Sequence, residues 1–418
     1  MALNPEEFHQ RRQERAQRRA QRQARQRKLI LYLAVAGVVL LACGLLIIRT
    51  TKTGRGSAST TAPQETVPNT VIHLAAAGDL NITDGVVNAG GADFDYTETF
   101  LDVAPLLADP DLTVLNFEGN LCGAPYGSAT GSAPQGLAES LRKAGVDVIQ
   151  LANSYSINKG LAGLVETINT TRAAGLEPLG VYESEAAYKS GKGYIIREVE
   201  GVKIALVAFT KGMDGMALPE NSTNCVNLLY TDYESTYQNV DREKITKILD
   251  AAASEKPDLT VAMLHWGSEF NDTLSASQNE IVKLMQEHGV DAIIGTHSHY
   301  VQKMTLDKET GMFVAYSLGD FFGDGAKSGT QYSVILDLEI TKNNETGETK
   351  ITGYSFTPIF TVNDGGKLRV VRIAEAMSAF DQDYLGKISD EAYVNMQYAL
   401  ERIENRITVP EESTEPQN

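Results

Sequence analysis

The sequence predicts an α/β domain with a central sheet, and it predicts one membrane-spanning segment in front of that domain. From residue 71 onward, short apolar runs alternate with segments of helical periodicity. Alternation on this scale is typical of a sheet covered by helices. Near the amino terminus lies a long run without charge, and polar residues gather where several predicted strands end.

The charge-free run covers residues 29–48, which are 20 residues. At about 1.5 Å per residue, such a helix matches a hydrocarbon core of roughly 30 Å, so we expect a transmembrane helix. The Arg-rich residues 1–28 should stay in the cytoplasm, which predicts a single-pass protein of the cell membrane with its main domain extracellular. A cleaved signal peptide is an alternative, as is lipoprotein processing at Cys43, and the length of the run favours an anchor.

The charge is unevenly distributed along the chain. Its formal net charge is −17, from 37 basic and 54 acidic residues. The first 55 residues hold 12 of the basic residues and 3 of the acidic ones, which leaves 25 and 51, a net charge of −26, for the rest. A body this acidic excludes binding to nucleic acid by general attraction. An anionic substrate would need a local cation, which a bound metal ion supplies.

Composition and periodicity divide the chain into six parts. They are a basic cytoplasmic segment (1–28), a transmembrane helix (29–48), a flexible linker rich in Thr, Ser, Gly and Pro (49–70), the main domain (71–363), a C-terminal extension with a closing helix over 389–407 (364–409), and a disordered tail (410–418). Strands are expected at 71–77, 112–116, 146–152, 202–209, 259–264, 290–294, 313–317 and 332–340, followed by an antiparallel hairpin strand over 351–361. Helices are expected at 136–144, 163–174, 242–254 and 277–288.

Two histidines one residue apart follow the strand predicted over 290–294. Residues i and i+2 of an extended chain project to one face, so His297 and His299 can reach one centre. Gly295 lets the chain turn at the carboxyl end of the strand, where open α/β sheets place their sites. A third histidine, His265, follows the strand over 259–264. This arrangement favours a metal site.

Carboxylates stand at comparable places after other predicted strands. Asp79 follows the first strand, Glu118 the second and Asp320 the seventh. Each alone has a plain structural explanation, as a turn residue, a helix cap or a solvated charge. Carboxylates and imidazoles that converge at strand ends suit Zn²⁺, Mn²⁺ or Fe²⁺. A pair of such ions would clamp a tetrahedral transition state and generate hydroxide from water.

Together these clusters resemble the poly-γ-glutamate capsule synthesis protein family (CapA-type), a branch similar to the calcineurin-like metallophosphatases. The resemblance implies a four-layer αβ sandwich with a dinuclear centre in which Asp79 binds one ion and Glu118 bridges two. It further implies His265, His297 and His299 as ligands, His265 also in catalysis, with Asn116, Asn153, Glu269 and Asp320 supporting the ligands. The motifs that carry the resemblance are Gly78-Asp79, Asn116-Phe117-Glu118, Leu151-Ala152-Asn153, His265-Trp266-Gly267-Ser268-Glu269, Gly295-Thr296-His297-Ser298-His299 and Tyr316-Ser317-Leu318-Gly319-Asp320-Phe321.

The third motif departs from the family, which has Asn-Asn-His where this chain has Asn153, Ser154 and Tyr155. Ser154 therefore occupies the position of a metal ligand, and Tyr155 that of the residue expected as general acid or phosphate contact. A tyrosine has an ordinary pKa of about 10, so it can donate a hydrogen bond to an oxyanion but does not change its proton state near neutral pH.

Three functions remain open from the sequence. The first is a metal-dependent hydrolase or transferase that acts on an envelope polymer or a phosphoester. The second is a non-catalytic metal-binding partner of polymer synthase or exporter subunits, favoured by the altered third motif. The third is a binding domain with a vestigial site. Whether Cys122 and Cys225 pair as a disulfide also stays open, since disulfides are permitted outside the cell.

Overall fold

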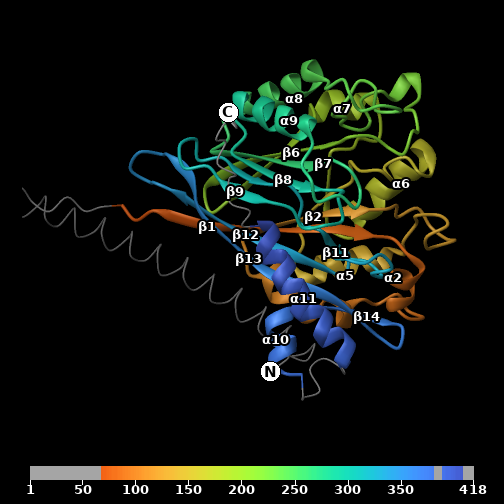
Figure 1. Ribbon diagram of the computed structural model, residues 1–418. Helices are drawn as coiled ribbons and strands as arrows, with labels where there is room; N and C mark the ends of the chain where they lie inside the picture. The colour runs from red at the N-terminus through yellow and green to blue at the C-terminus, as the bar shows by residue number, and fades with distance from the viewer. Residues whose placement is uncertain (1–66, 381–387, 408–418) are drawn as a thin grey trace, which may run out of the picture. The chain divides into compact units, whose positions relative to one another are not determined.

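The computed structural model describes residues 67–380 and 388–407, which form two β-sheets with helices on their outer sides (Figure 1). The first sheet has eight strands in the order β14-β13-β12-β1-β2-β3-β4, with β11 paired to β1 beside this path. Its strands are β1 (Thr70–Asn81), β2 (Leu112–Glu118), β3 (Val148–Gln150), β4 (Glu177–Leu179), β11 (Asp320–Phe322), β12 (Tyr332–Lys342), β13 (Thr349–Asp364) and β14 (Lys367–Arg372).

The second sheet has six strands in the order β5-β6-β7-β8-β10-β9. Strands β6, β7, β8 and β10 run parallel, as do β1 to β4 of the first sheet, while β5 and β9 are antiparallel edge strands. Its strands are β5 (Tyr194–Val199), β6 (Val202–Thr210), β7 (Leu259–His265), β8 (Ala292–Thr296), β9 (Met304–Leu306) and β10 (Phe313–Ala315).

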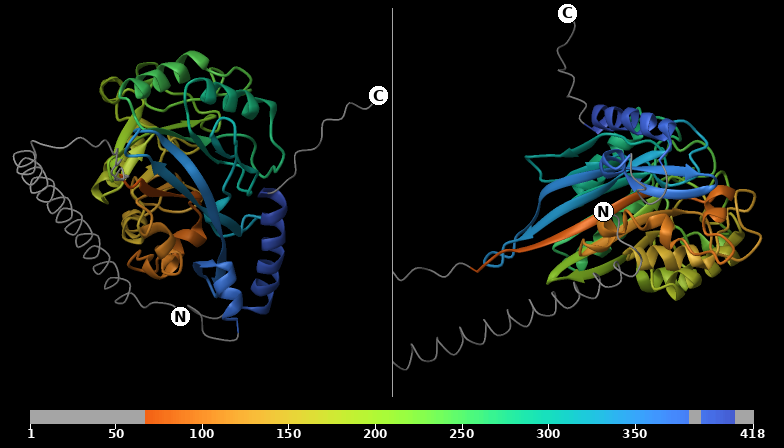
Figure 2. Two further views of the ribbon diagram at one scale, coloured as in Figure 1. Left: turned by 90° about the vertical axis from the view of Figure 1, so that its left-hand side faces the viewer. Right: turned by 90° about the horizontal axis from the view of Figure 1, so that it is seen from below.

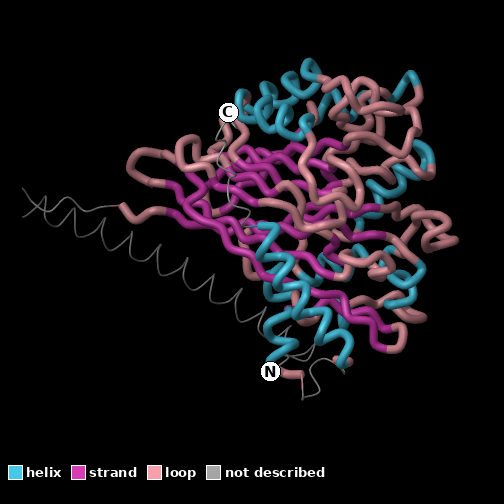
Figure 3. The backbone as a smooth tube through the Cα atoms, viewed as in Figure 1, coloured by secondary structure: helices cyan, strands magenta, loops and turns pink. Residues whose placement is uncertain are grey.

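Helices cover the outer faces of the two sheets (Figure 3). Helices α8 and α9 lie beyond the second sheet, and α2 to α5 lie beyond the first (Figure 1). Helix α11 contacts β12 and β13 (Figure 2). The helices are α2 (Asp84–Ala89), α3 (Thr97–Phe100), α4 (Ala104–Ala108), α5 (Gln135–Ala144), α6 (Gly160–Ala173), α7 (Glu185–Gly191), the 3-10 helix η1 (Glu220–Ser222), α8 (Arg242–Ser254), α9 (Ala276–Glu287), α10 (Ile373–Ser378) and α11 (Asp390–Ile407).

The main core lies between the two sheets. Leu74 and Val114 of the first sheet belong to the same buried cluster as Leu206 and Val261 of the second. Strands buried on both faces are built from continuous apolar residues, as the sequence has them. The layers run helix, sheet, sheet, helix, which confirms the α/β class and the four-layer sandwich that the resemblance implies. The single central sheet predicted from the strand pattern is wrong, because the strands divide between two sheets.

Several elements differ from the prediction. Strands β4, β9 and β11 are not predicted, and each has only three residues. Strand β14 pairs with β13 beyond residue 363, where the sequence predicts the end of the main domain. Helix α11 closes the described part of the chain, and its apolar face, with Met396 and Ile403, is buried in the main core.

Two predictions concern the amino-terminal region and the cysteines. The segments 1–28 and 29–48, most of the linker, and the tail 410–418 lie outside the described residues. Within residues 67–380 and 388–407, no helix has both the length and the apolar character of a membrane span. Cys122 and Cys225 are free thiols, so of the two alternatives left open by the sequence the structure shows unpaired cysteines and not a disulfide.

Candidate metal centre

The candidate site lies where strands of both sheets end. Asp79 is near the end of β1 and Glu118 ends the neighbouring β2, with which β1 runs parallel. In the second sheet, His265 ends β7 and lies beside Thr296, the last residue of β8. Parallel strands place their carboxyl ends at one edge, so residues far apart in the chain meet there.

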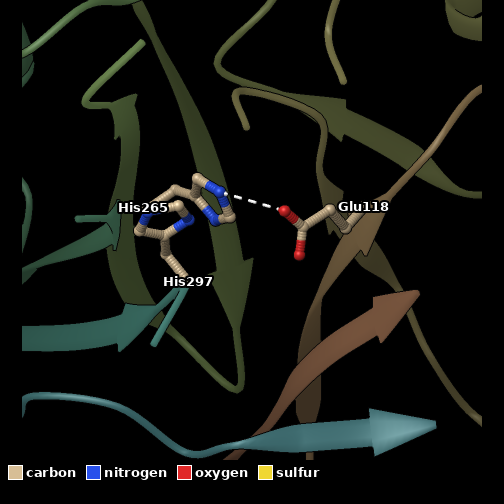
Figure 4. Close-up of side chains that lie close together, drawn as sticks. All are labelled: Glu118, His265 and His297. Atoms are coloured by element: carbon tan, nitrogen blue, oxygen red, sulfur yellow. Dashed lines mark ion pairs between the residues drawn. The ribbon is translucent and has the colours of Figure 1, made fainter. Parts of the chain in front are cut away.

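Glu118, His265 and His297 form the first group of donor atoms. Their side chains point toward one another in Figure 4, with Glu118 on one side and the two imidazoles on the other. His265 Nε2 lies 3.3 Å from Glu118 Oε1, and the two imidazole centroids are 4.4 Å apart. One atom from each residue falls within 4.8 Å of the others, close enough to share an ion. All three residues are buried.

A second group lies beside the first and consists of Asp79, His299 and Asp320. His299 Nδ1 is 2.8 Å from Asp320 Oδ1. Asp79 connects the groups, because its Oδ2 accepts a hydrogen bond of 2.9 Å from the backbone N–H of His297. The sequence predicts Asp320 only as a supporting residue, whereas the structure places its carboxylate among the possible ligands. The structure thus has two adjacent groups of possible ligands, but Glu118 belongs to only one of them, whereas the resemblance implies it as a bridge between two ions.

The histidine pair reaches the site by a different geometry from the one expected. His297 has φ +87° and His299 has φ +60°, so neither lies on an extended strand. Left-handed backbone at residues other than glycine costs about 1–3 kcal/mol each and concentrates at functional sites. The two imidazoles consequently serve neighbouring groups rather than one face of β8, and Phe270 stacks on His299 with ring centroids 4.8 Å apart.

Gly78 permits the close approach that brings Asp320 to Asp79. A Cβ at position 78 would lie 1.8 Å from the carbonyl oxygen of Gly319. The same carbonyl accepts a 2.9 Å hydrogen bond from the backbone N–H of Asp79. Any side chain at position 78 would force β11 away from β1.

Neighbouring polar side chains hold the candidate ligands in place. Asn116 Nδ2 donates to Asp79 Oδ1 at 2.5 Å, and Asn153 Nδ2 donates to Asn116 Oδ1 at 3.3 Å. His265 Nδ1 lies 3.1 Å from Thr296 Oγ1, which leaves Nε2 facing Glu118. Asn116 and Asn153 therefore lie where supporting residues are predicted, and Thr296 is a contact that the sequence does not predict. Such contacts fix the orientation of metal ligands.

The altered third motif lies at the edge of the first group. Ser154 is buried, and its Oγ lies 3.2 Å from His265 Nε2. Burial, with the carboxylates of Glu118, Asp214 and Glu269, raises the pKa of Tyr155 to about 12. Tyr155 therefore stays protonated at neutral pH. Glu269 is exposed and lines a cavity, and no hydrogen bond joins it to a ligand among the described residues.

Burial of so many ionisable groups shifts their pKa values strongly. Burial, together with the charge of Glu118, raises the pKa of Asp79, and burial raises that of Glu118 to about 8. Burial lowers the pKa of His265 and His297, so both imidazoles are neutral with a lone pair to donate. For His299, burial is outweighed by the carboxylates, Asp320 above all, and the pKa rises to about 10.

The donor set fits divalent cations. Glu118 Oε2 and His297 Nδ1 are buried without a hydrogen-bond partner among the described residues. An unsatisfied buried polar atom costs about 1–3 kcal/mol, which a coordinated ion would remove. Cations would also stabilise the ionised form of the buried carboxylates. Three carboxylates and three imidazoles are ligands of the kind that Zn²⁺, Mn²⁺ and Fe²⁺ take.

A cavity of about 250 Å³ opens beside the first group, and His297 is the member of that group that lines it. Its lining consists of Ser154, Lys211, Gly212, Asp214, Tyr237, Ser268, Glu269 and His297. Lys211 is absent from the residues predicted for the site, although it follows the strand predicted over 202–209. The rule of polar residues at strand ends, applied to that strand as well, would have found it.

An α/β domain of two sheets with a buried carboxylate–imidazole centre defines a candidate metalloprotein. Residues 73–324, more than half of the 418, match the family described as bacterial capsule synthesis protein PGA_cap. The chain belongs to this family, which confirms the resemblance seen in the sequence.

Two relatives and two solved structures illustrate the similarity. Capsule biosynthesis protein CapA of Bacillus anthracis is 26% identical over 319 residues, covering 73% of this chain and 72% of the relative. PGA biosynthesis protein CapA of Bacillus subtilis (strain 168) is 24% identical over 343 residues, covering 78% and 82%. A phosphatase from Mycoplasma pneumoniae has a TM-score of 0.43 at 16% identity, covering 70% of this chain and 95% of that chain. The calcineurin-like phosphoesterase YfkN of Bacillus subtilis has a TM-score of 0.41 at 16% identity, covering 81% and 100%.

Proposed function

We propose that this protein takes part in capsule polymer synthesis as a metal-dependent hydrolase or transferase that acts on an envelope polymer or a phosphoester. The observation that carries the proposal is the pair of buried donor groups beside an open cavity, with Glu118 Oε2 and His297 Nδ1 unpartnered among the described residues. The family and the names of its relatives supply the polymer context.

Each donor group would bind one ion, and Tyr155 would contact the substrate. Glu118, His265 and His297 would hold one ion, and Asp79, His299 and Asp320 a second. When bound, such ions polarise a substrate oxygen and make bound water a nucleophile at neutral pH. Tyr155 remains protonated and would donate a hydrogen bond to a developing oxyanion.

Metal content and turnover of the full-length protein test this proposal together. We expect near-stoichiometric Mn, Zn or Fe by elemental analysis, and hydrolysis of p-nitrophenyl esters or of capsule polymer. His265→Ala and His297→Ala should reduce both. His288→Ala is the matched control, since His288 caps α9 and contacts Asp250 instead of the centre. Activity that survives both changes at the centre would reject the hydrolase proposal.

A second function is favoured by the third motif. Ser154 and Tyr155 replace a ligand and a general acid of the family, and Tyr155 cannot shuttle a proton near neutral pH. The alternative is a non-catalytic metal-binding partner of the subunits that make or export the polymer. Stoichiometric metal without turnover, together with co-purification of such subunits, would support it over the first.

We place the protein in the cell membrane, with a cytoplasmic amino terminus and the domain from residue 71 extracellular. The uncharged run over 29–48 and the basic residues before it support this orientation. Protease added to intact cells should release a fragment that begins within residues 50–69. If residues 50–69 are protected from external protease, the proposed orientation is wrong.

A further inference from the structure

The described residues that line the cavity beside the first donor group include one lysine, Lys211, and no arginine. Lys211 follows β6 directly, and Thr210 at the end of β6 pairs with His265 at the end of β7. The backbone N–H of Lys211 also donates to the His265 carbonyl at 2.8 Å. The backbone at position 211 is therefore fixed next to a candidate metal ligand.

The ammonium group of Lys211 is held in a defined place. Its Nζ donates to the carbonyl oxygen of Gly267 at 2.8 Å and lies 4.4 Å from the ring centroid of Tyr237. Lys211 is half-buried and, in the described part of the chain, forms no ion pair. Lysines are mostly exposed and are seldom buried without a paired charge. Asp214 and Glu269 of the same cavity interact with this ammonium, but neither forms an ion pair with it, so the ammonium can still contact an anion that enters the cavity.

The surrounding charges sharpen this conclusion. The chain after residue 55 has a net charge of −26, and such a surface repels anions unless a cation is placed locally. Asp214 and Glu269 line the same cavity but are exposed, whereas Lys211 is the more buried. An anionic group that enters the cavity would lie between the ammonium and the donor groups of the centre.

We propose that Lys211 binds an anionic group of the substrate, a carboxylate or a phosphate, next to the bond on which the centre acts. The inference rests on the proposed function, because it assigns Lys211 to the same substrate. Lys211 is a positioning residue here. A purely structural role would be to fix the Gly267 carbonyl and to offset the charges of Asp214 and Glu269.

Binding measurements separate these roles without requiring turnover. The full-length protein loaded with Mn²⁺ would be titrated by calorimetry with inorganic phosphate and, separately, with glutarate. Lys211→Gln should weaken binding of at least one anion about tenfold, the size expected for loss of one charge-assisted hydrogen bond. Lys211→Arg should retain most of the affinity. Lys203→Gln is the matched control, because Lys203 lies at the other end of β6 and also donates to a backbone carbonyl, that of Glu255.

The two anions identify the source of the charge. Loss confined to phosphate indicates a phosphoester, and loss confined to glutarate indicates a carboxylate polymer. Binding that is absent in the wild type, or equal in Lys211→Gln and wild type at equal metal content, would overturn the proposal. Protection from acetylation by acetic anhydride tests the same proposal without a variant. The anion should protect Lys211 but not Lys203. Equal labelling of Lys211 with and without the anion would also overturn the proposal.

Kinetics keep this inference distinct from the proposed function. If the protein turns over an anionic substrate, Lys211→Gln should raise KM about tenfold while kcat changes less. If no substrate is turned over but anion binding still depends on Lys211, the proposed function fails and the binding site stands. Turnover with an unchanged KM in Lys211→Gln would leave the proposed function in place and reject the role of Lys211.

Discussion

Replacing Glu118 by Gln should stabilise the metal-free protein and at the same time weaken its binding of divalent ions. Burial raises the pKa of this carboxyl from its ordinary 4.5 to about 8. At ~1.36 kcal/mol per pH unit, this rise corresponds to about 4–5 kcal/mol against the ionised form in the folded state. Gln has nearly the same shape and no charge, so the variant avoids this penalty. After relaxation around the site we expect a gain of about 2 kcal/mol in the metal-free state at pH 8.

The assay is urea unfolding in EDTA at pH 8, paired with titration of Mn²⁺ by calorimetry. Glu118→Gln should show a higher unfolding free energy without metal, and a smaller increase when Mn²⁺ is added, because binding to the native state alone stabilises it. Glu287→Gln is the control, an exposed residue of α9 whose loss should change stability by about 0.5 kcal/mol or less. A destabilised metal-free variant, or an unchanged affinity for Mn²⁺, would refute the reasoning.

Three further tests address the same centre. Ser154→Asn combined with Tyr155→His, which restores the motif of the family, should raise metal occupancy or turnover; no change in either would contradict the roles given to these positions. Gly78→Ala should lower stability by about 2 kcal/mol or more in thermal unfolding, because the alanine Cβ would lie 1.8 Å from the Gly319 carbonyl oxygen. A melting temperature equal to that of the wild type would count against the close approach of Gly78 to Gly319. Finally, the metal-free protein should lose about 2 kcal/mol of stability between pH 7 and pH 8, because folded Glu118 and folded His299 each still hold a proton that the unfolded chain has released. Loading with Mn²⁺ should remove this slope, and a flat profile in EDTA would disprove both raised pKa values.

Part of this site can be predicted from the sequence, because polar residues that directly follow parallel strands gather at one edge of a sheet. Asp79, Glu118 and His265 each follow an apolar run, and parallel strands end at a common edge. The order of apolar runs and polar residues along the chain is therefore enough to name these three candidate ligands. The same rule, applied to every strand, also reaches Lys211.

Other features depend on tertiary packing that no local pattern contains. Asp320 enters the site because β11, a strand of three residues, lies beside β1 through the close approach at Gly78. His297 and His299 look like a strand pair in sequence, but a left-handed turn directs them to separate groups. Strand β14 is not predicted because its pairing with β13, rather than its own periodicity, makes it part of the sheet.

The spacing of the donors along the chain has a consequence for how metal is acquired. Asp79 and Asp320 lie near opposite ends of residues 73–324, the part of the chain that matches the family. Both donor groups are therefore complete only when nearly all of this region is present. Contacts this remote form late, after most of the entropy of loop closure has been lost. An ion would thus bind after the domain has folded. By linking strands of both sheets it would slow unfolding, so chelators should shorten the lifetime of the native state.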